Sequence, residues 1–402
     1  KVNLQLRLID AAKANAIGDA AMRISRGEFD LAFPLSVWQT GSGTQSNMNV
    51  NEVIASLASR QVPVHPNDDV NLGQSSNDIF PTAMHLATLV QLHALLLPAL
   101  NALRGALSRK SEEFAGFAKV GRTHLQDATP VTLGQEFGGY AAQLALCSTG
   151  ITSALGGVNA LAIGGTAVGT GMNTHPEFGT RVVALLAHEL HLPLVQADNL
   201  FAAMAGHEAL VALHGALRML AIALTKIAND IRLMGSGPRA GLGELNLPQN
   251  EAGSSIMPGK VNPTQVEALT MVCAQVMGHD VAIGIAAAQG QFELNVYKPL
   301  IALNVLDSIR LLADSMQSFR THCVEGIQAN AERLERDLQK SLMLVTALAP
   351  HIGYDKSAQL ARYAQQHGCT LREAALALEL VTAAEFDQWV RPQDMLGSVV
   401  PD

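Results

Sequence analysis

The sequence predicts a mainly α-helical fold with a bundle of long helices at its centre. Of its 402 residues, 48% are hydrophobic but only 4% are aromatic, and alanine and leucine are abundant. Alanine and leucine favour helices, whereas aromatic and β-branched residues favour strands. Several apolar stretches exceed the usual helix length of about 11–12 residues and are hydrophobic on more than one face, which is typical of helices inside a bundle.

Apolar residues at helical spacing predict the helices in order along the chain. The expected ranges are 1–26, 81–117, 132–155, 177–188, 199–233, 263–288 and 292–332, followed by shorter helices with Pro breaks. Pro98 lies inside the second range, where its missing N–H should bend the helix or shift its hydrogen bonding. Gly, Pro, Ser and Asn interrupt residues 29–78.

These changes in residue pattern along the chain predict three domains. An N-terminal domain covers residues 1–74, a central helical bundle covers 75–331, and a small C-terminal helical domain covers 332–402.

The low charge content predicts extensive burial. Charged residues make up 15% of the chain and the net charge is −8, which argues against general nucleic-acid binding. Local donors must therefore hold any anionic substrate. The most apolar stretch, Ala209–Ile227, contains His214, Arg218 and Lys226, so a buried core helix is expected there and no membrane partner.

The cysteines indicate a reducing compartment. Cys147, Cys273, Cys323 and Cys369 show no CxxC spacing, so we expect reduced thiols in helices and neither a disulfide framework nor a zinc site. The cytoplasm is the expected location, and a mitochondrial matrix also fits. No secretory signal opens the chain, and its start at Lys1 suggests a truncated or partly ordered sequence.

The segment Gly253–Pro263 is the most informative stretch. Gly and Pro interrupt it repeatedly, and it carries Ser254, Ser255, Lys260 and Asn262. Such a loop presents amide N–H groups, hydroxyls and a positive charge to an anion. It fails the phosphate-loop pattern GxxxxGK[ST], since Pro258 stands where Gly is needed.

Two polar clusters precede expected helices. Ser42, Gly43 and Thr44 come just before a helix expected to begin near Asn47. The second cluster is Ser75, Ser76 and Asn77, just before the first long bundle helix. These side chains can cap their helices, or they can hold a carboxylate at a helix N-terminus.

A third cluster places His124 beside Thr123, in a loop expected between two helical stretches. Histidine transfers protons near neutral pH, although a lone histidine is more often structural. His188-Glu189-Leu190-His191 misses the HExxH zinc spacing, and no GxSxG elbow is present.

These clusters, with the Gly164–Thr174 segment, resemble class II fumarases, the iron-independent fumarate hydratases of the fumarase/aspartase superfamily, in order and nearly residue by residue. His124 separates the chain from aspartases, which resemble Gly-Arg-Thr-Gln-Leu-Gln at that site. The resemblance implies a three-domain fumarase/aspartase-like fold whose bundles pool into the helical core of a homotetramer. Each active site would then draw on three subunits.

The resemblance further implies reversible, stereospecific hydration of fumarate to L-malate in the tricarboxylic acid cycle, without a cofactor or metal. Ser254 would be the base, as an alkoxide, and His124 would activate water with Glu267 as its carboxylate partner. An aci-carboxylate intermediate would need pre-placed donors. The implied substrate-binding residues are Ser42, Gly43, Thr44, Ser75, Ser76, Asn77, Thr123, Ser255, Lys260, Val261 and Asn262.

A secondary carboxylate site is implied at His65, Pro66, Asn67 and Asp68, but the chain departs from the family just before it. The stretch from Arg60 to His65 is short and lacks the basic residue often found there. The family also carries a longer N-terminal segment.

Two alternatives remain open. Aspartase chemistry would require ammonia, which His124 argues against. A non-enzymatic structural homologue, as in lens crystallins, would have no need to retain Ser254, Lys260, His124 and Asn262 together.

Overall fold

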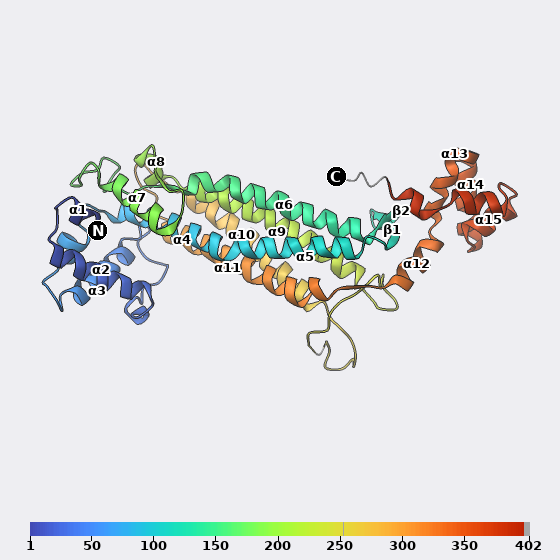
Figure 1. Ribbon diagram of the computed structural model, residues 1–402, viewed down its shortest axis with the longest axis horizontal. Coiled ribbons are helices and arrows are strands. Elements are labelled where there is room, and N and C mark those ends of the chain that lie inside the picture. The colour runs from blue at the N-terminus through green and yellow to red at the C-terminus, as the bar shows by residue number, and fades with distance from the viewer. Residues whose placement is uncertain (252, 398–402) are drawn as a thin grey trace. The chain divides into compact units, whose positions relative to one another are not determined.

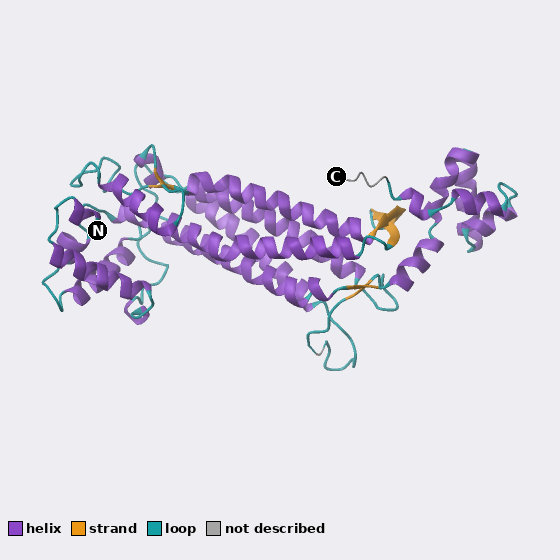
Figure 2. Ribbon diagram, in the orientation of Figure 1, coloured by secondary structure: helices purple, strands orange, loops and turns teal. Residues whose placement is uncertain are grey.

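The computed structural model describes residues 1–251 and 253–397, and most of them are helical (Figures 1 and 2). The helices are α1 (Val2–Gln5), α2 (Ala11–Ser25), α3 (Thr44–Ala58), α4 (Ser76–Gln91), α5 (Leu97–Glu113), α6 (Leu133–Val158), α7 (Phe178–Leu190), α8 (Leu200–Ala205), α9 (Glu208–Met234), α10 (Thr264–Ala287), α11 (Lys298–His322), α12 (Ala331–Lys340), α13 (Ala349–Ile352), α14 (Tyr354–His367), α15 (Leu371–Ala377) and α16 (Ala383–Trp389). The short strands are β1 (Ala118–Thr123), β2 (Gln126–Thr132), β3 (Ala160–Leu161), β4 (Val195–Gln196), β5 (Leu245–Asn246) and β6 (Gln328–Ala329). The mainly helical fold is confirmed.

The chain forms two compact units, and the long helices α6, α9, α10 and α11 each contribute residues to both. The first unit comprises Lys1–Ala99, Leu146–Ile222 and Met271–Asp314. Within it, α2 packs on α3 through small and branched apolar side chains, among them Ala16, Ala20, Ile54 and Leu57. Small residues such as alanine let the two backbones approach closely.

A polar network joins three helices inside the first unit. The ring of His214 on α9 is fully buried, with Nδ1 2.9 Å from Oδ1 of Asp280 on α10 and Nε2 2.9 Å from Oγ of Ser308 on α11. Because a buried polar group is costly without a partner, these contacts fix how the three helices face one another.

The second unit comprises Leu100–Ala145, Ala223–Thr270 and Ser315–Asp402. Its antiparallel pair β1–β2 packs on a hydrophobic core formed by the C-terminal helices. Val120 from β1 joins Leu348, Leu360, Ala374 and Phe386 there. The hairpin is thus held by residues more than two hundred positions further along the chain.

The expected effect of Pro98 is confirmed. A π-helical segment, Leu92–Leu96, lies between α4 and α5, and the N–H of Leu97 donates to the carbonyl of Leu92. This wider turn shifts the hydrogen-bond register just before the proline, whose nitrogen has no proton to donate.

Other expected boundaries were wrong. The range 199–233 is two helices, α8 and α9, separated by Gly206 and His207. The range 292–332 contains α11, but its end forms β6 instead. The helix expected near Asn47 begins at Thr44, after Gly43 with a φ of 80°. The expected C-terminal domain ends in residues 398–402, which lie outside the described part.

Candidate active site

The loop before α3 places Ser42 against Thr44. Ser42 is buried, its Oγ lies 2.8 Å from Thr44 Oγ1, and it accepts a 3.3 Å hydrogen bond from the Thr44 N–H. Gly43 must lack a side chain, because an added Cβ would lie 2.2 Å from the Phe80 ring. Both hydroxyls therefore sit together at the N-terminus of a helix, where an anion is favoured.

Ser75 caps α4 in a reciprocal arrangement with Asp78. The Ser75 Oγ accepts from the N–H of Asn77 at 3.2 Å, and the Ser75 N–H donates to Asp78 Oδ1 at 3.0 Å. The capping interpretation of Ser75 is thus confirmed. The other carboxylate oxygen accepts from the N–H groups of Gly164 and Thr166 at 3.0 and 2.9 Å. Burial raises the pKa of Asp78, against the lowering effect of these hydrogen bonds.

The first two clusters meet within the first unit. Asn47 on α3 donates a 3.0 Å hydrogen bond from Nδ2 to Oγ of Ser76 on α4. Asn77 donates to the carbonyl of Ala167 at 2.7 Å, within the glycine-rich segment that the resemblance singled out. The helix starts that carry Thr44 and Ser76 are therefore linked side chain to side chain, although far apart in sequence.

The secondary cluster forms a self-contained turn. His65 caps the π-helical turn Pro66–Val70, because its Nδ1 accepts from the N–H groups of Asn67 and Asp68 at 3.3 and 3.2 Å. Beside it, Asp69 pairs with Lys13 at 2.8 Å. These polar contacts account for the turn without a ligand.

His124 does not lie in an irregular loop, as expected, but at the tip of a β-hairpin. His124 and Leu125 form the two-residue turn between β1 and β2, with φ of 57° and 58°. Both side chains are exposed. Val120, Thr123, Thr129, Val131 and Thr132 are the β-branched signal that would have predicted these strands.

A cavity of about 360 Å³ opens beside His124. It is lined by charged and aromatic groups that the sequence-based site did not include: Lys119, Arg122, Glu136, Tyr140 and Asp230. Arg122 lies two residues before His124 in the sequence, whereas no short motif singles out the other four.

The loop Gly253–Pro263 folds back on itself. Ser254 Oγ accepts hydrogen bonds from the N–H groups of Ile256 at 3.3 Å and Met257 at 3.0 Å. Asn262 Nδ2 donates to the carbonyl of Gly253. An added Cβ at Gly253 would lie 1.8 Å from the Lys260 carbonyl oxygen, so only glycine allows this approach. Converging N–H donors stabilise negative charge on the Ser254 oxygen.

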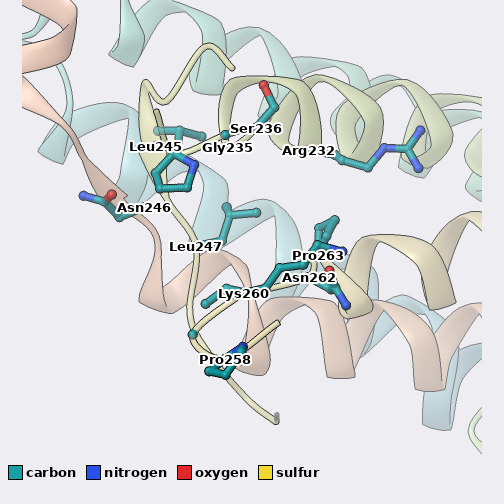
Figure 3. A pocket seen from close by; sticks show the side chains of 14 residues that line it. Arg232, Gly235, Ser236, Leu245, Asn246, Leu247, Pro258, Lys260, Asn262 and Pro263 are labelled. Carbon is teal, nitrogen blue, oxygen red and sulfur yellow. The ribbon is translucent and has the colours of Figure 1, made fainter. Parts of the chain in front are cut away.

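Lys260 and Asn262 line a second cavity of about 660 Å³ (Figure 3). Arg232 and Ser236, at the end of α9 and just beyond it, line the same cavity across from them. Lys260, Val261 and Ser255 are exposed on this loop. The cavity therefore presents cations and amide groups, as an anionic substrate requires.

Glu267 is exposed in the first turn of α10. Among residues 1–251 and 253–397, no hydrogen bond or ion pair joins His124 to Ser254 or Glu267, and no group of three or more His, Cys, Asp or Glu is arranged to hold a metal ion. One loop carries Ser254, Lys260 and Asn262, whereas His124 lies in the turn of the β1–β2 hairpin.

Comparisons with known proteins identify one family. Residues 1–278 match the family model described as Lyase, and residues 344–397 match that of the fumarase C C-terminus. A class II fumarate hydratase from Chromobacterium violaceum is 62% identical over 98% of this chain and 88% of its own. The human mitochondrial fumarate hydratase is 56% identical over 97% of this chain and 78% of its own. A crystal structure of a class II fumarase from Schistosoma mansoni superposes with a TM-score of 0.95 at 47% identity, covering 98% of this chain and 87% of that one.

Proposed function

This chain belongs to the class II fumarate hydratases of the fumarase/aspartase superfamily, and we propose that Ser254, His124 and Glu267 carry its hydration of fumarate to L-malate. It is a lyase that adds and removes water. The named relatives do not favour the alternative of an aspartate ammonia-lyase.

In the direction from malate to fumarate, Ser254 removes the proton from the carbon next to a carboxylate. A serine hydroxyl is ordinarily far too weak an acid to act as an alkoxide, so its negative charge needs strong local stabilisation. The two amide hydrogen bonds to Ser254 Oγ, from Ile256 and Met257, supply such donors. This is the observation that carries the proposal.

Loss of that proton gives an aci-carboxylate with two negative charges on the acid group. Preorganised donors stabilise charge that develops during the reaction. Lys260 and Asn262 occupy the same loop as the base, on the wall of the large cavity, so they are suited to this task. Ser42, Thr44, Ser75, Ser76, Asn77, Thr123 and Ser255 would hold the carboxylates, with the Gly43 and Val261 backbone beside them.

His124 handles the water, as base in hydration and as acid when the hydroxyl departs. Its exposure at the tip of a hairpin allows it to reach a substrate bound outside its own cavity. Glu267 is the proposed carboxylate that orients its imidazole. No hydrogen bond or ion pair joins these two side chains within the described residues of one chain. We therefore propose that they meet between subunits of the assembled oligomer.

The proposed assembly is a homotetramer whose active sites each use three subunits. Helix α10 supports it, since Met271, Val281 and Ile285 on that helix are 68%, 63% and 60% exposed. An apolar surface of this kind is normally covered by a partner. A second copy of the chain would cover it with the same kind of helix.

A membrane is the competing partner for this surface. Ser76–Glu113, Leu133–Val158, Glu208–Met234 and Thr264–Ala287 are long and apolar enough to cross one by length and composition. The two alternatives separate in detergent-free buffer. A tetramer by light scattering, dissociated by Val281→Glu, supports assembly through α10. A chain that stays in solution only with detergent would contradict it.

We also propose the three-domain division at residues 74 and 331, and a cytoplasmic location with the mitochondrial matrix as the eukaryotic alternative. The secondary site at His65, Pro66, Asn67 and Asp68 would bind a carboxylate weakly, because His65 Nδ1 already accepts two backbone N–H groups.

The activity is tested with the purified chain after EDTA treatment, by following the loss of fumarate absorbance with and without ammonia. Rapid loss without ammonia, with L-malate as product, is the expected result and would also show that no metal is needed. Loss only with ammonia would indicate an aspartase. No loss in either condition would contradict an enzymatic role.

A further inference from the structure

The turn that carries His124 is strained. In a two-residue hairpin turn with both φ values positive, the favoured residues are Asn and Gly. Here the positions hold His124 and Leu125, at 57° and 58°. Side chains at such angles clash with their own backbone, and this conformation persists only where the surroundings hold it in place.

The register between β1 and β2 shifts beside Gly121. Between the pairs Val120–Pro130 and Arg122–Asp127, one residue of β1, Gly121, faces two of β2, Ala128 and Thr129, so the extra residue of this bulge lies in β2. An added Cβ at Gly121 would lie 2.4 Å from the Thr129 carbonyl oxygen. Although residues three apart point to opposite faces of a regular strand, Lys119 and Arg122 both reach the same carboxylate, that of Glu244.

Glu244 belongs to an ionic network in which it and Lys119 are buried, while Arg122 and Glu136 are partly exposed. Its Oε1 is 2.7 Å from Arg122 Nη1, and its Oε2 is 2.9 Å from Lys119 Nζ. Lys119 is also 2.8 Å from Glu136. Glu244 and Lys119 are each only 1% exposed. Two cations face two carboxylates, so the network is balanced in charge, and removing one member would leave a buried charge uncompensated.

The backbone of Glu244 is fixed as well. Its N–H donates to the carbonyl of Met234 at the end of α9, and its carbonyl accepts from the N–H of Asn330, both at 2.9 Å. The backbone of Glu244 is therefore held by two hydrogen bonds and its carboxylate by two cations. Arg122, two residues before His124, binds this carboxylate and lines the same cavity as His124.

We propose that Glu244 is a positioning residue for the reaction, which holds Arg122 and through it the strained hairpin turn that presents His124. The inference rests on the proposed role of His124. Glu244 has no contact with substrate in this assignment. It fixes the position of the His124 imidazole, and its negative charge balances the positive charge of Arg122.

The cavity's other titratable groups are themselves constrained. Tyr140 donates to Asp230 at 3.0 Å, and Lys226 pairs with the same carboxylate. Burial raises the pKa of Glu136, against the effect of Lys119. Neutralising Glu244 would therefore leave Arg122 and Lys119 opposite Glu136 alone, with one excess positive charge beside His124.

The test is Glu244→Gln in the full-length assembled enzyme. We expect kcat to fall by roughly 10- to 100-fold with little change in KM, because a small displacement of a catalytic group slows the chemical step. The acidic limb of the kcat pH profile should move to lower pH, since the unpaired Arg122 cation disfavours a protonated imidazole. Glu335→Gln on α12, an exposed side chain, is the matched control and should change neither value.

Two further variants keep the proposal testable if Glu244→Gln folds poorly. Glu244→Asp retains the charge, so its pH profile should match the unmodified enzyme even though its shorter reach lowers kcat. The double variant Arg122→Gln/Glu244→Gln removes both charges, and its acidic limb should return to the original pH. Circular dichroism and light scattering establish that each variant is assembled.

An unchanged kcat and pH profile in folded Glu244→Gln would overturn the inference. A drop in kcat with an unmoved acidic limb would do the same, because a merely structural role predicts that result. His124→Asn separates the proposed role of His124 from that of Glu244. If that variant keeps full activity, the proposed role of His124 fails; if it loses activity while Glu244→Gln does not, only the positioning role fails.

Discussion

The backbone N–H of Met257 donates a 3.0 Å hydrogen bond to Oγ of Ser254. The Ile256 N–H donates to the same oxygen. The loop therefore has its donors in place around this hydroxyl before any substrate binds. Preorganised donors need no rearrangement when charge develops during the reaction. This lack of rearrangement accounts for most of their contribution to catalysis.

Ser254→Ala removes the proposed base. We expect kcat to fall by about 10²–10⁴-fold, the usual contribution of a positioned base, with an unchanged thermal midpoint because the side chain is partly exposed in a loop. Steady-state kinetics in both directions measure this. Ser25→Ala, at the exposed end of α2, is the control. Full activity of Ser254→Ala would remove Ser254 from the mechanism.

Lys260→Met removes the positive charge from the wall of the large cavity while keeping most of the side-chain length. A hydrogen bond to a charged group contributes about 1.5–3 kcal/mol, so kcat/KM for fumarate should fall by roughly 10- to 100-fold. Lys340→Met, at the exposed end of α12, should leave kcat/KM unchanged. Equal kcat/KM values in the two variants would mean that Lys260 does not stabilise the charge of the reacting acid group.

Asp78→Ala should destabilise the fold without removing a proposed ligand. Three backbone N–H groups, those of Ser75, Gly164 and Thr166, donate to this carboxylate. Losing a cap and leaving buried donors unpaired should cost about 3 kcal/mol. Urea unfolding at fixed protein concentration measures the loss. Asp19→Ala on α2, which is exposed, should cost almost nothing; similar losses in both would contradict the capping role.

Lys298 should make stability depend on pH in the alkaline range. The side chain is fully buried and donates to the Asn295 carbonyl at 2.7 Å, and burial lowers the pKa of Lys298 to about 8. Between pH 8 and its ordinary value of 10.5, the unfolded chain holds a proton that the folded chain has released. Stability contributed by this residue therefore rises with pH in that window, by at most about 1.4 kcal/mol per pH unit.

In Lys298→Met that rise should be absent. Unfolding free energies at several pH values between 7.5 and 10, for both proteins, test this. Lys356→Met, which changes an exposed lysine on α14, should keep the slope. Parallel slopes for the unmodified chain and Lys298→Met would refute the expectation.

The sequence predicted some local features well. The long helix α10, expected over 263–288, spans Thr264–Ala287, because its apolar residues and the preceding Pro263 are signals within one segment. The disturbance near Pro98 was also predicted, since a missing N–H acts on its own helix. The β-hairpin was missed, because β1 and β2 hold only two and three β-branched residues, a short signal between two long helical stretches.

By itself, the sequence determined the family and the helical class, and it supplied the residues proposed for the chemistry, because these depend on residue types at short spacings. Only the tertiary structure decided which of them meet. Arg122 and Glu244 lie 122 positions apart, and both Arg122 and Lys119 reach that carboxylate in the folded chain. A charged side chain gains its ionic partner only when the chain folds. Once the side chain is buried, its energy depends strongly on whether a partner of opposite charge is present.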